Sequence, residues 1–195
     1  MTSSDLTGAR LRETATRKQR ALRWLPSFLG FPIGGLVAHL IAGPVDGVAA
    51  ALSAGAISGV ILGAAQAWGL GWTGTDARRW TIATGVGFAG GIALGAGAVD
   101  YGTTMADFAL QGALCGLVVG GAQAVVLRAW LGGHAPLWAP VLSALWALGW
   151  VVSTAIGVDV DRQWTVFGAS GAITVTLATA FLPVLLAERG RRVSS

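Results

Sequence analysis

The sequence predicts an all-α integral membrane protein, a helical bundle of six transmembrane helices arranged as three hairpin repeats. The chain has 195 residues, of which 54% are hydrophobic and only 11% are charged. About a quarter of the residues of a soluble domain are charged, so this chain carries more apolar surface than one aqueous core could bury. Two further observations support this fold class: six apolar segments follow one another, and a glycine-rich motif occurs twice.

The positions of the basic residues argue against a nucleic-acid partner, although the net charge is +4. Most of the arginines and lysines precede the first apolar segment or follow the last one. Membrane proteins concentrate basic residues in this way on the cytoplasmic side. The single cysteine, Cys115, excludes an internal disulfide and a cysteine-based metal cluster.

A polar and basic stretch, residues 1–23, comes first. It is either a solvated tail that sets the orientation of the chain or an interfacial helix attracted to anionic lipid headgroups. Six apolar segments follow, at 24–43, 47–71, 80–98, 105–131, 137–157 and 163–187. Each offers the roughly 20 residues that cross a bilayer, and the short connections between them make neighbouring helices antiparallel.

These segments define one transmembrane domain over residues 24–187, followed by a basic tail, residues 188–195. We expect its hairpins to be 24–71, 80–131 and 137–187. An even number of spans places both ends on one side, and the basic residues of the inner loops fall on that side too. The rule that positive charge stays inside therefore predicts a multi-pass protein of the cell (plasma) membrane with both termini in the cytoplasm.

The repeat is clearest in two stretches separated by 57 residues. Residues 55–68 read GAISGVILGAAQAW and residues 112–125 read GALCGLVVGGAQAV. Residues four apart lie on one helix face, so each copy carries one glycine face ending in a glutamine. The glycines are Gly55, Gly59 and Gly63 in the first copy and Gly112, Gly116 and Gly120 in the second. In the last segment the glycine and glutamine pattern is largely lost, which makes it a diverged third copy.

Two interpretations of the glycine faces stay open. In lipid no hydrophobic force drives helices together, so small residues that let backbones approach closely are the usual packing device. Alternatively, the smooth faces line a cavity for a flat apolar ligand such as a quinone or a carotenoid. The spacing alone does not separate helix packing from ligand binding.

Five polar residues are candidates for contact with a ligand or solute. Gln66 and Gln123 are amides near the cytoplasmic end of their spans, and they either bond across the repeat interface or contact a ligand headgroup. His39 is the one ionisable residue well inside a span, which makes it a functional candidate. Asp107 begins the fourth span, where the helix dipole favours a carboxylate, and it precedes Gln111 by one turn.

The sequence offers no catalytic set, no metal-binding cluster and no phosphate-binding loop, so we expect a protein that is not an enzyme and has no cofactor. The histidines His39 and His134 fall in opposite halves of the membrane, which excludes bis-histidine haem ligation. An intramembrane enzyme would require His39 to meet an acid from another span.

The pattern GxxxGxxQAxxLR at 116–128, with the variant GAAQAWGL at 63–70, resembles that of a group of small bacterial multi-pass membrane proteins of uncharacterised role. In these proteins a glycine-rich span ends with glutamine and arginine, and a tryptophan-bearing span follows, as RRWTIATGVGFAGG does here. The resemblance covers about residues 55–157. The first copy lacks the arginine, and the third lacks the glutamine. The resemblance implies a membrane protein and implies no particular activity.

Two functions are consistent with these patterns. The first is a non-catalytic bundle in the lipid bilayer that binds a lipid-soluble ligand or a membrane partner subunit, which includes a second copy in a homo-oligomer. The second is a small transporter or channel with Gln66, Gln123, Gln111 and Asp107 along its path. Against the second, transporters usually carry more ionisable groups in their spans.

Overall fold

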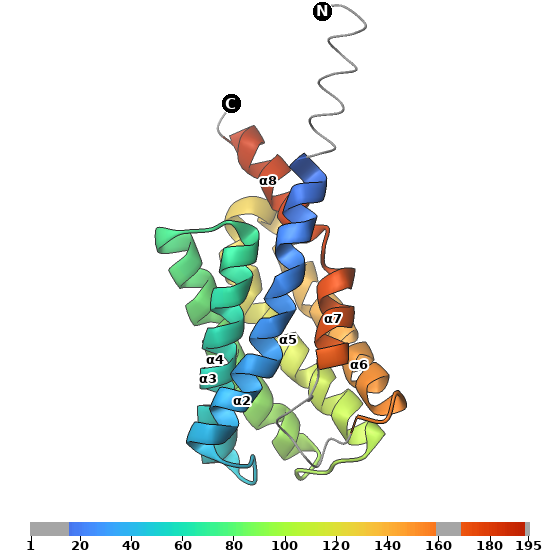
Figure 1. The fold of residues 1–195 in the computed structure, drawn as a ribbon. Helices are drawn as coiled ribbons and strands as arrows, with labels where there is room; N and C mark the ends of the chain where they lie inside the picture. The colour runs from blue at the N-terminus through green and yellow to red at the C-terminus, as the bar shows by residue number, and fades with distance from the viewer. Residues whose placement is uncertain (1–15, 159–168, 194–195) are drawn as a thin grey trace, which may run out of the picture.

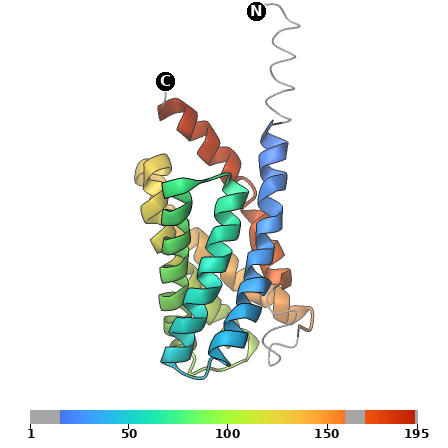
Figure 2. The same ribbon diagram turned by 60° about the vertical axis from the view of Figure 1, so that its left-hand side comes forward.

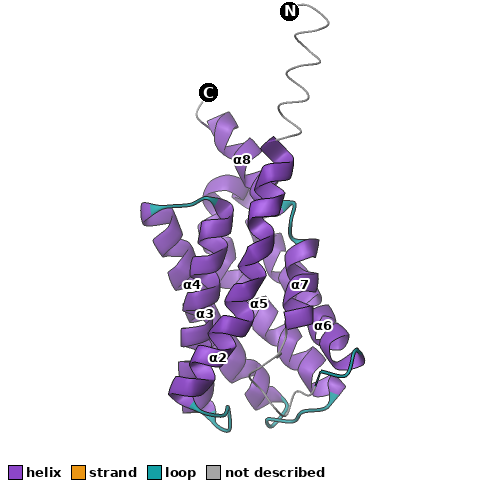
Figure 3. Cartoon of the chain, in the orientation of Figure 1, coloured by secondary structure: helices purple, strands orange, loops and turns teal. Residues whose placement is uncertain are grey.

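The computed structural model describes residues 16–158 and 169–193. Every regular element in these two ranges is a helix. The elements run in the order η1 (Leu25–Leu29), α2 (Gly30–Ala42), α3 (Val48–Leu70), α4 (Gly74–Ala98), α5 (Met105–Leu131), η2 (Gly132–Leu137), α6 (Trp138–Ala155), α7 (Ala169–Ala178) and α8 (Leu182–Val193). Figure 1 shows them as an upright bundle, and Figure 3 shows the same chain with its helices joined by short loops.

Five helices in the described ranges are long and apolar enough to cross a membrane. They are Thr16–Ala42, Val48–Leu70, Gly74–Ala98, Met105–Ala155 and Ala169–Leu186. The 51-residue stretch Met105–Ala155 contains α5, the short helix η2 and α6. The all-helical fold class is therefore confirmed, together with several helices of membrane-spanning length.

The first long helix starts earlier than the predicted boundary after residue 23. Residues 16–24 are helical and continue through η1 into α2. Pro26 lies in the first turn of η1, and proline removes a backbone donor, so the chain tightens there into a 3₁₀ turn. The basic stretch therefore continues directly into the first apolar helix from Thr16 onward, while residues 1–15 lie outside the described part.

Consecutive helices pack antiparallel, and the glycine faces lie at their contacts. A β-carbon added at Gly55 would lie 2.7 Å from Ala89 Cα, and one added at Gly63 would lie 2.9 Å from Thr81 Cα, so α3 and α4 run in opposite directions. Gly116 and Gly120 make the same kind of contact between α5 and α6. These glycines are packing positions, because their neighbours' backbones occupy the space that a side chain would need.

The first long helix lies between α3 and α7 and so closes the bundle. Its η1 segment contacts α3 on one side and α7 on the other, and Figure 2 shows it beside both the α3–α4 pair and the C-terminal helices. Residues 16–24 and α8 lie at the same end of the bundle, at the top of Figure 1. Arg17 and Glu188 join them through an ion pair of 3.1 Å.

The predicted sixth segment, residues 163–187, is not one continuous helix in its described part. A turn at residues 179–181 separates α7 from α8. Pro183, in the first turn of α8, has no N–H, and its ring would clash with the carbonyl of Thr179 in a continuous helix. Residues 163–168 lie outside the described ranges.

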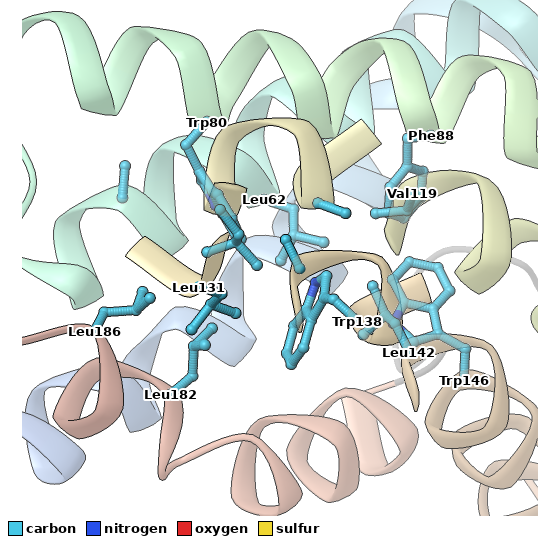
Figure 4. Packing of buried hydrophobic residues seen from close by; sticks show 14 of the residues in the cluster. Leu62, Trp80, Phe88, Val119, Leu131, Trp138, Leu142, Trp146, Leu182 and Leu186 are labelled. Carbon is cyan, nitrogen blue, oxygen red and sulfur yellow. The ribbon is translucent and has the colours of Figure 1, made fainter. Parts of the chain in front are cut away.

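The outward faces of the bundle are apolar. Leu40, Ile41, Val86 and Val125 are all at least two-thirds exposed, which water would penalise and lipid would not. The buried cluster in Figure 4 contains leucine and aromatic side chains from the long helices together with Leu182 and Leu186 of α8. The amphipathic α8 therefore covers one end of the core.

Candidate functional site

Three tryptophans at the start of α4, at the start of α6 and in the first long helix each donate a hydrogen bond to another helix. Trp80 Nε1 donates to Gln66 Oε1 of α3 at 3.1 Å, and Trp138 Nε1 donates to Gln123 Oε1 of α5 at 2.8 Å. Trp24 Nε1 donates to Thr179 Oγ1, just after α7, at 3.1 Å. We call Trp24, Trp80 and Trp138 the tryptophan trio.

The two glutamines that the repeat singled out contact each other. Gln123 Nε2 donates to Gln66 Oε1 at 3.3 Å and to Thr84 Oγ1 at 3.0 Å. Thr84 in turn donates to the carbonyl of Trp80 at 2.8 Å. Gln123 is only 2% exposed and Thr84 is fully buried, so this network joins α3, α4 and α5 inside the bundle.

The indole groups fix which way both amides point. An indole N–H can only donate, so the atom of each glutamine that faces Trp80 or Trp138 must be the carbonyl oxygen. The oxygen of Gln66 accepts two hydrogen bonds, which uses both of its lone pairs. The amino group of Gln66 has no hydrogen-bond partner in the described part of the chain.

A second aromatic group lies about two helical turns deeper. Phe31, Phe88 and Trp146 follow the members of the tryptophan trio by seven or eight residues on the same helices. Their ring centroids are 6.0 Å apart for Phe31 and Phe88, 5.9 Å for Phe31 and Trp146, and 5.0 Å for Phe88 and Trp146. We call these three residues the aromatic triad; Figure 4 labels Phe88 and Trp146.

An inner cavity of about 50 Å³ lies among these groups. Its wall includes the whole tryptophan trio, Gln66 and Gln123, and two members of the aromatic triad, Phe31 and Trp146. None of its lining residues in the described ranges is charged. The sequence places Gln66 and Gln123 near the same end of the bundle. In the structure both amides line the inner cavity.

An outer cavity of about 130 Å³ lies in the other half of the bundle, toward the loops at 43–47 and 99–104. His39 and Gln111, which the sequence placed on different spans, both line it. The two cavities share Phe31, Trp146 and Trp150 in their walls. Two members of the aromatic triad, Phe31 and Trp146, therefore form the shared wall together with Trp150, and the third member, Phe88, lines the outer cavity.

Asp107 serves as a helix cap. Its carboxylate accepts hydrogen bonds from the Thr104 backbone N–H at 3.0 Å and from the Thr104 hydroxyl at 2.7 Å. In return, the Asp107 backbone N–H donates to Thr104 Oγ1. This capping box begins α5. Asp107 is not in the described lining of either cavity, so the structure does not bring it together with Gln66 or Gln123.

Tryptophans near the ends of membrane spans commonly face the lipid interface, yet the tryptophan trio points inward. Its members are 2%, 0% and 7% exposed, whereas Trp68 is 53% exposed. The signal that could have distinguished them is their spacing of 56 and 58 residues, which matches the repeat. A tryptophan whose spacing follows the glutamine repeat is a candidate partner for that glutamine.

Within the described ranges, no group of three or more His, Cys, Asp or Glu side chains could hold a metal ion. In comparisons with known proteins, no family model, no curated protein and no solved structure matches this chain.

Proposed function

We propose that this chain is a non-catalytic membrane protein that binds a small lipid-soluble ligand in its inner cavity. The observation that carries the proposal is the amino group of Gln66, a hydrogen-bond donor without a partner in the described residues, beside a cavity whose wall includes seven aromatic side chains. Gln66 is half-buried, and a bound molecule that accepts this hydrogen bond would satisfy the donor inside the bundle.

The proposal includes six spans in three hairpins, with both ends in the cytoplasm. The tryptophan trio supports the repeat, because each tryptophan begins one hairpin and bonds to the last helix of another. Trp80 and Trp138 bond to the preceding hairpin, and Trp24 bonds to the final one. This order closes three hairpins into a ring around the inner cavity, as parallel repeats about an axis along the membrane normal would do.

The size of the cavity limits the ligand. A water molecule needs about 10–15 Å³ of such space, and a cavity of about 150 Å³ binds benzene. The inner cavity of about 50 Å³ is too small for a quinone or a carotenoid with the side chains in these positions. We therefore propose a ligand of only a few heavy atoms.

Native mass spectrometry of the protein released from lipid nanodiscs tests this function. The expected result is extra mass well below that of a lipid, held stoichiometrically and lost in the Gln66→Leu variant. Extra mass of tens of kilodaltons would instead indicate a partner subunit or a second copy. A bare chain from every preparation would contradict ligand binding.

Transport of a small solute is the second candidate, and the outer cavity is the observation that favours it. Two cavities in opposite halves of the bundle share one wall, and substrate sites of transporters lie near the bilayer midplane. A path would run from the outer cavity, past the aromatic triad, to the inner cavity.

Flux measurements in liposomes test transport, with Phe88→Leu as the informative variant. Leucine removes the ring contacts of Phe88 with Phe31 and Trp146, so flux of small neutral solutes should rise. Phe181→Leu, at a position that is 53% exposed, is the matched control and should leave flux unchanged. Equal flux in wild type, in both variants and in empty liposomes would rule out a path through the triad.

A further inference from the structure

The chemistry of the ligand can be derived from the atoms that the inner cavity leaves unpaired. The carbonyl oxygens of both glutamines already accept hydrogen bonds from indole N–H groups. The amino group of Gln123 donates to Gln66 and to Thr84. In the described residues, the Gln66–Gln123 pair therefore has one amino group left over, that of Gln66.

Trp146 supplies a second donor of the same kind. It lines the inner cavity and is 8% exposed, and its indole N–H makes no hydrogen bond to another residue in the described ranges. Of the three hydroxyl side chains in the described wall, that of Thr176 makes no hydrogen bond within the described residues and can also donate to a ligand, whereas the other two are already paired. Thr179 Oγ1 accepts from Trp24 and donates to the carbonyl of Val175 at 2.8 Å, and Ser153 Oγ lies 3.1 Å from Ser170 Oγ.

The lack of charged side chains in the described lining narrows the class of ligand further. Among the described lining residues, a cation would meet N–H donors and no carboxylate, and an anion would meet no arginine or lysine. Burying an ion without a partner of opposite charge is far costlier than burying a neutral polar group. The aromatic walls favour the apolar part of a neutral molecule.

We infer that the inner cavity takes a small neutral molecule whose carbonyl or similar acceptor oxygen is bound by the amino group of Gln66. This inference rests on the proposed ligand-binding function and adds the class of ligand. The apolar part of the molecule packs against Trp138 and Trp146, and the Trp146 N–H is the second available donor. With only about 50 Å³ of space, a compact ketone or amide suits the cavity better than any ring.

Acetone and isobutene are the matched probes, because they have the same shape and differ in the carbonyl oxygen. The protein is held in lipid nanodiscs, and each probe is titrated while the ¹⁵N signals of the Gln66 side-chain amide and the Trp146 indole are followed by NMR. Acetone should shift the Gln66 signal saturably, whereas isobutene should leave that signal in place.

Variants provide the second readout. Gln66→Met keeps the length of the side chain and removes the donor, so the acetone dissociation constant, read from the Trp146 signal, should rise about threefold to tenfold. Gln19→Met, the same substitution at an exposed position of the first long helix that lines neither cavity, is the matched control and should leave it unchanged. If Gln66→Met fails to fold, the shift of the wild-type Gln66 amide decides the question without it.

The outcomes separate the class of ligand from the function itself. Saturable binding of acetone and isobutene with equal affinity, or saturable binding of tetramethylammonium, would overturn the acceptor class while leaving ligand binding in place. Absence of a saturable shift with every probe would overturn both. A Gln66-dependent preference for acetone supports the inference.

Discussion

At the scale of single residues, the tryptophan–glutamine pairs explain how polar groups are accommodated inside this apolar bundle. Each glutamine brings an amide into a region where water cannot satisfy it, and an unpaired amide there is costly. The indole N–H of Trp138 meets the oxygen of Gln123, and that of Trp80 meets the oxygen of Gln66. The repeat motif thus places each amide beside an indole N–H that makes no other hydrogen bond in the described part of the chain.

Replacing Gln123 by leucine tests the strength of this network. The change leaves the Trp138 N–H, the Thr84 hydroxyl and one lone pair of Gln66 without their partner. Hydrogen bonds between membrane helices contribute about 0.6–2 kcal/mol each, so we expect the free energy of unfolding to fall by about 1–3 kcal/mol. Unfolding in mixed micelles measures it. The control, Gln111→Leu, should cost much less, and equal losses would contradict the network.

At the scale of elements, close backbone contact at the glycines determines which helices pair. Gly55 and Gly63 lie against α4, and Gly116 and Gly120 lie against α6. With both backbones this close, dispersion contacts hold together helices that no hydrophobic force assembles in lipid. The cavities lie on the other side of these contacts, toward the centre of the bundle.

Gly116→Ala and Gly121→Ala are a matched pair on α5. A β-carbon at Gly116 would lie 2.7 Å from the Leu142 carbonyl oxygen, whereas one at Gly121 would have nothing within 4 Å. We expect Gly116→Ala to lower the free energy of unfolding by about 1–3 kcal/mol through overpacking. Gly121→Ala should be neutral or slightly stabilising. Thermal unfolding of both variants provides the measurement, and similar midpoints would contradict this packing.

The turn between α7 and α8 provides a second prediction at this scale. Ala180 N–H donates to the Leu177 carbonyl, so the Thr176 carbonyl loses its usual helical partner and accepts a hydrogen bond from Trp24 Nε1 at 3.1 Å. Trp24→Phe keeps an aromatic ring and removes the donor. We expect faster amide hydrogen exchange across residues 179–186, measured by mass spectrometry. Exchange that rises equally in α3 would show general unfolding and would contradict a local role.

At the scale of the whole molecule, lipid is the solvent that the surface indicates. Apolar side chains are exposed on the helices around the bundle, and five helices have the length and composition to cross a membrane. The loop at residues 43–47 and the turn at residues 71–73 lie at opposite ends of α3. A spanning bundle must therefore expose them on opposite sides of the membrane.

Cysteine accessibility measures this orientation. In a Cys115→Ala background, Asp46→Cys and Thr75→Cys place one exposed thiol at each end of the bundle. We expect a membrane-impermeant maleimide to label Asp46→Cys in intact cells and Thr75→Cys only after permeabilisation. Reversed labelling would contradict cytoplasmic termini. Labelling of both positions from one side would contradict a spanning bundle.

The class of fold and the approximate bounds of most helices could be predicted from the amino-acid sequence, because apolar composition and short loops depend on local chain chemistry. The sequence also singled out Gln66 and Gln123, whose spacing is a property of the repeat. It did not predict the break after α7, where a proline in the following turn and a distant indole act together.

The contacts of these residues depend on how the helices pack against one another. Trp24 lies 155 residues from Thr179 along the chain, so no local pattern could have paired them. Asp107 became a helix cap, while His39 and Gln111 came to line one cavity. Two members of the aromatic triad lie in the wall that both cavities share. A cavity is what remains unfilled after side chains from several helices have packed, and its position is therefore a property of the assembled bundle.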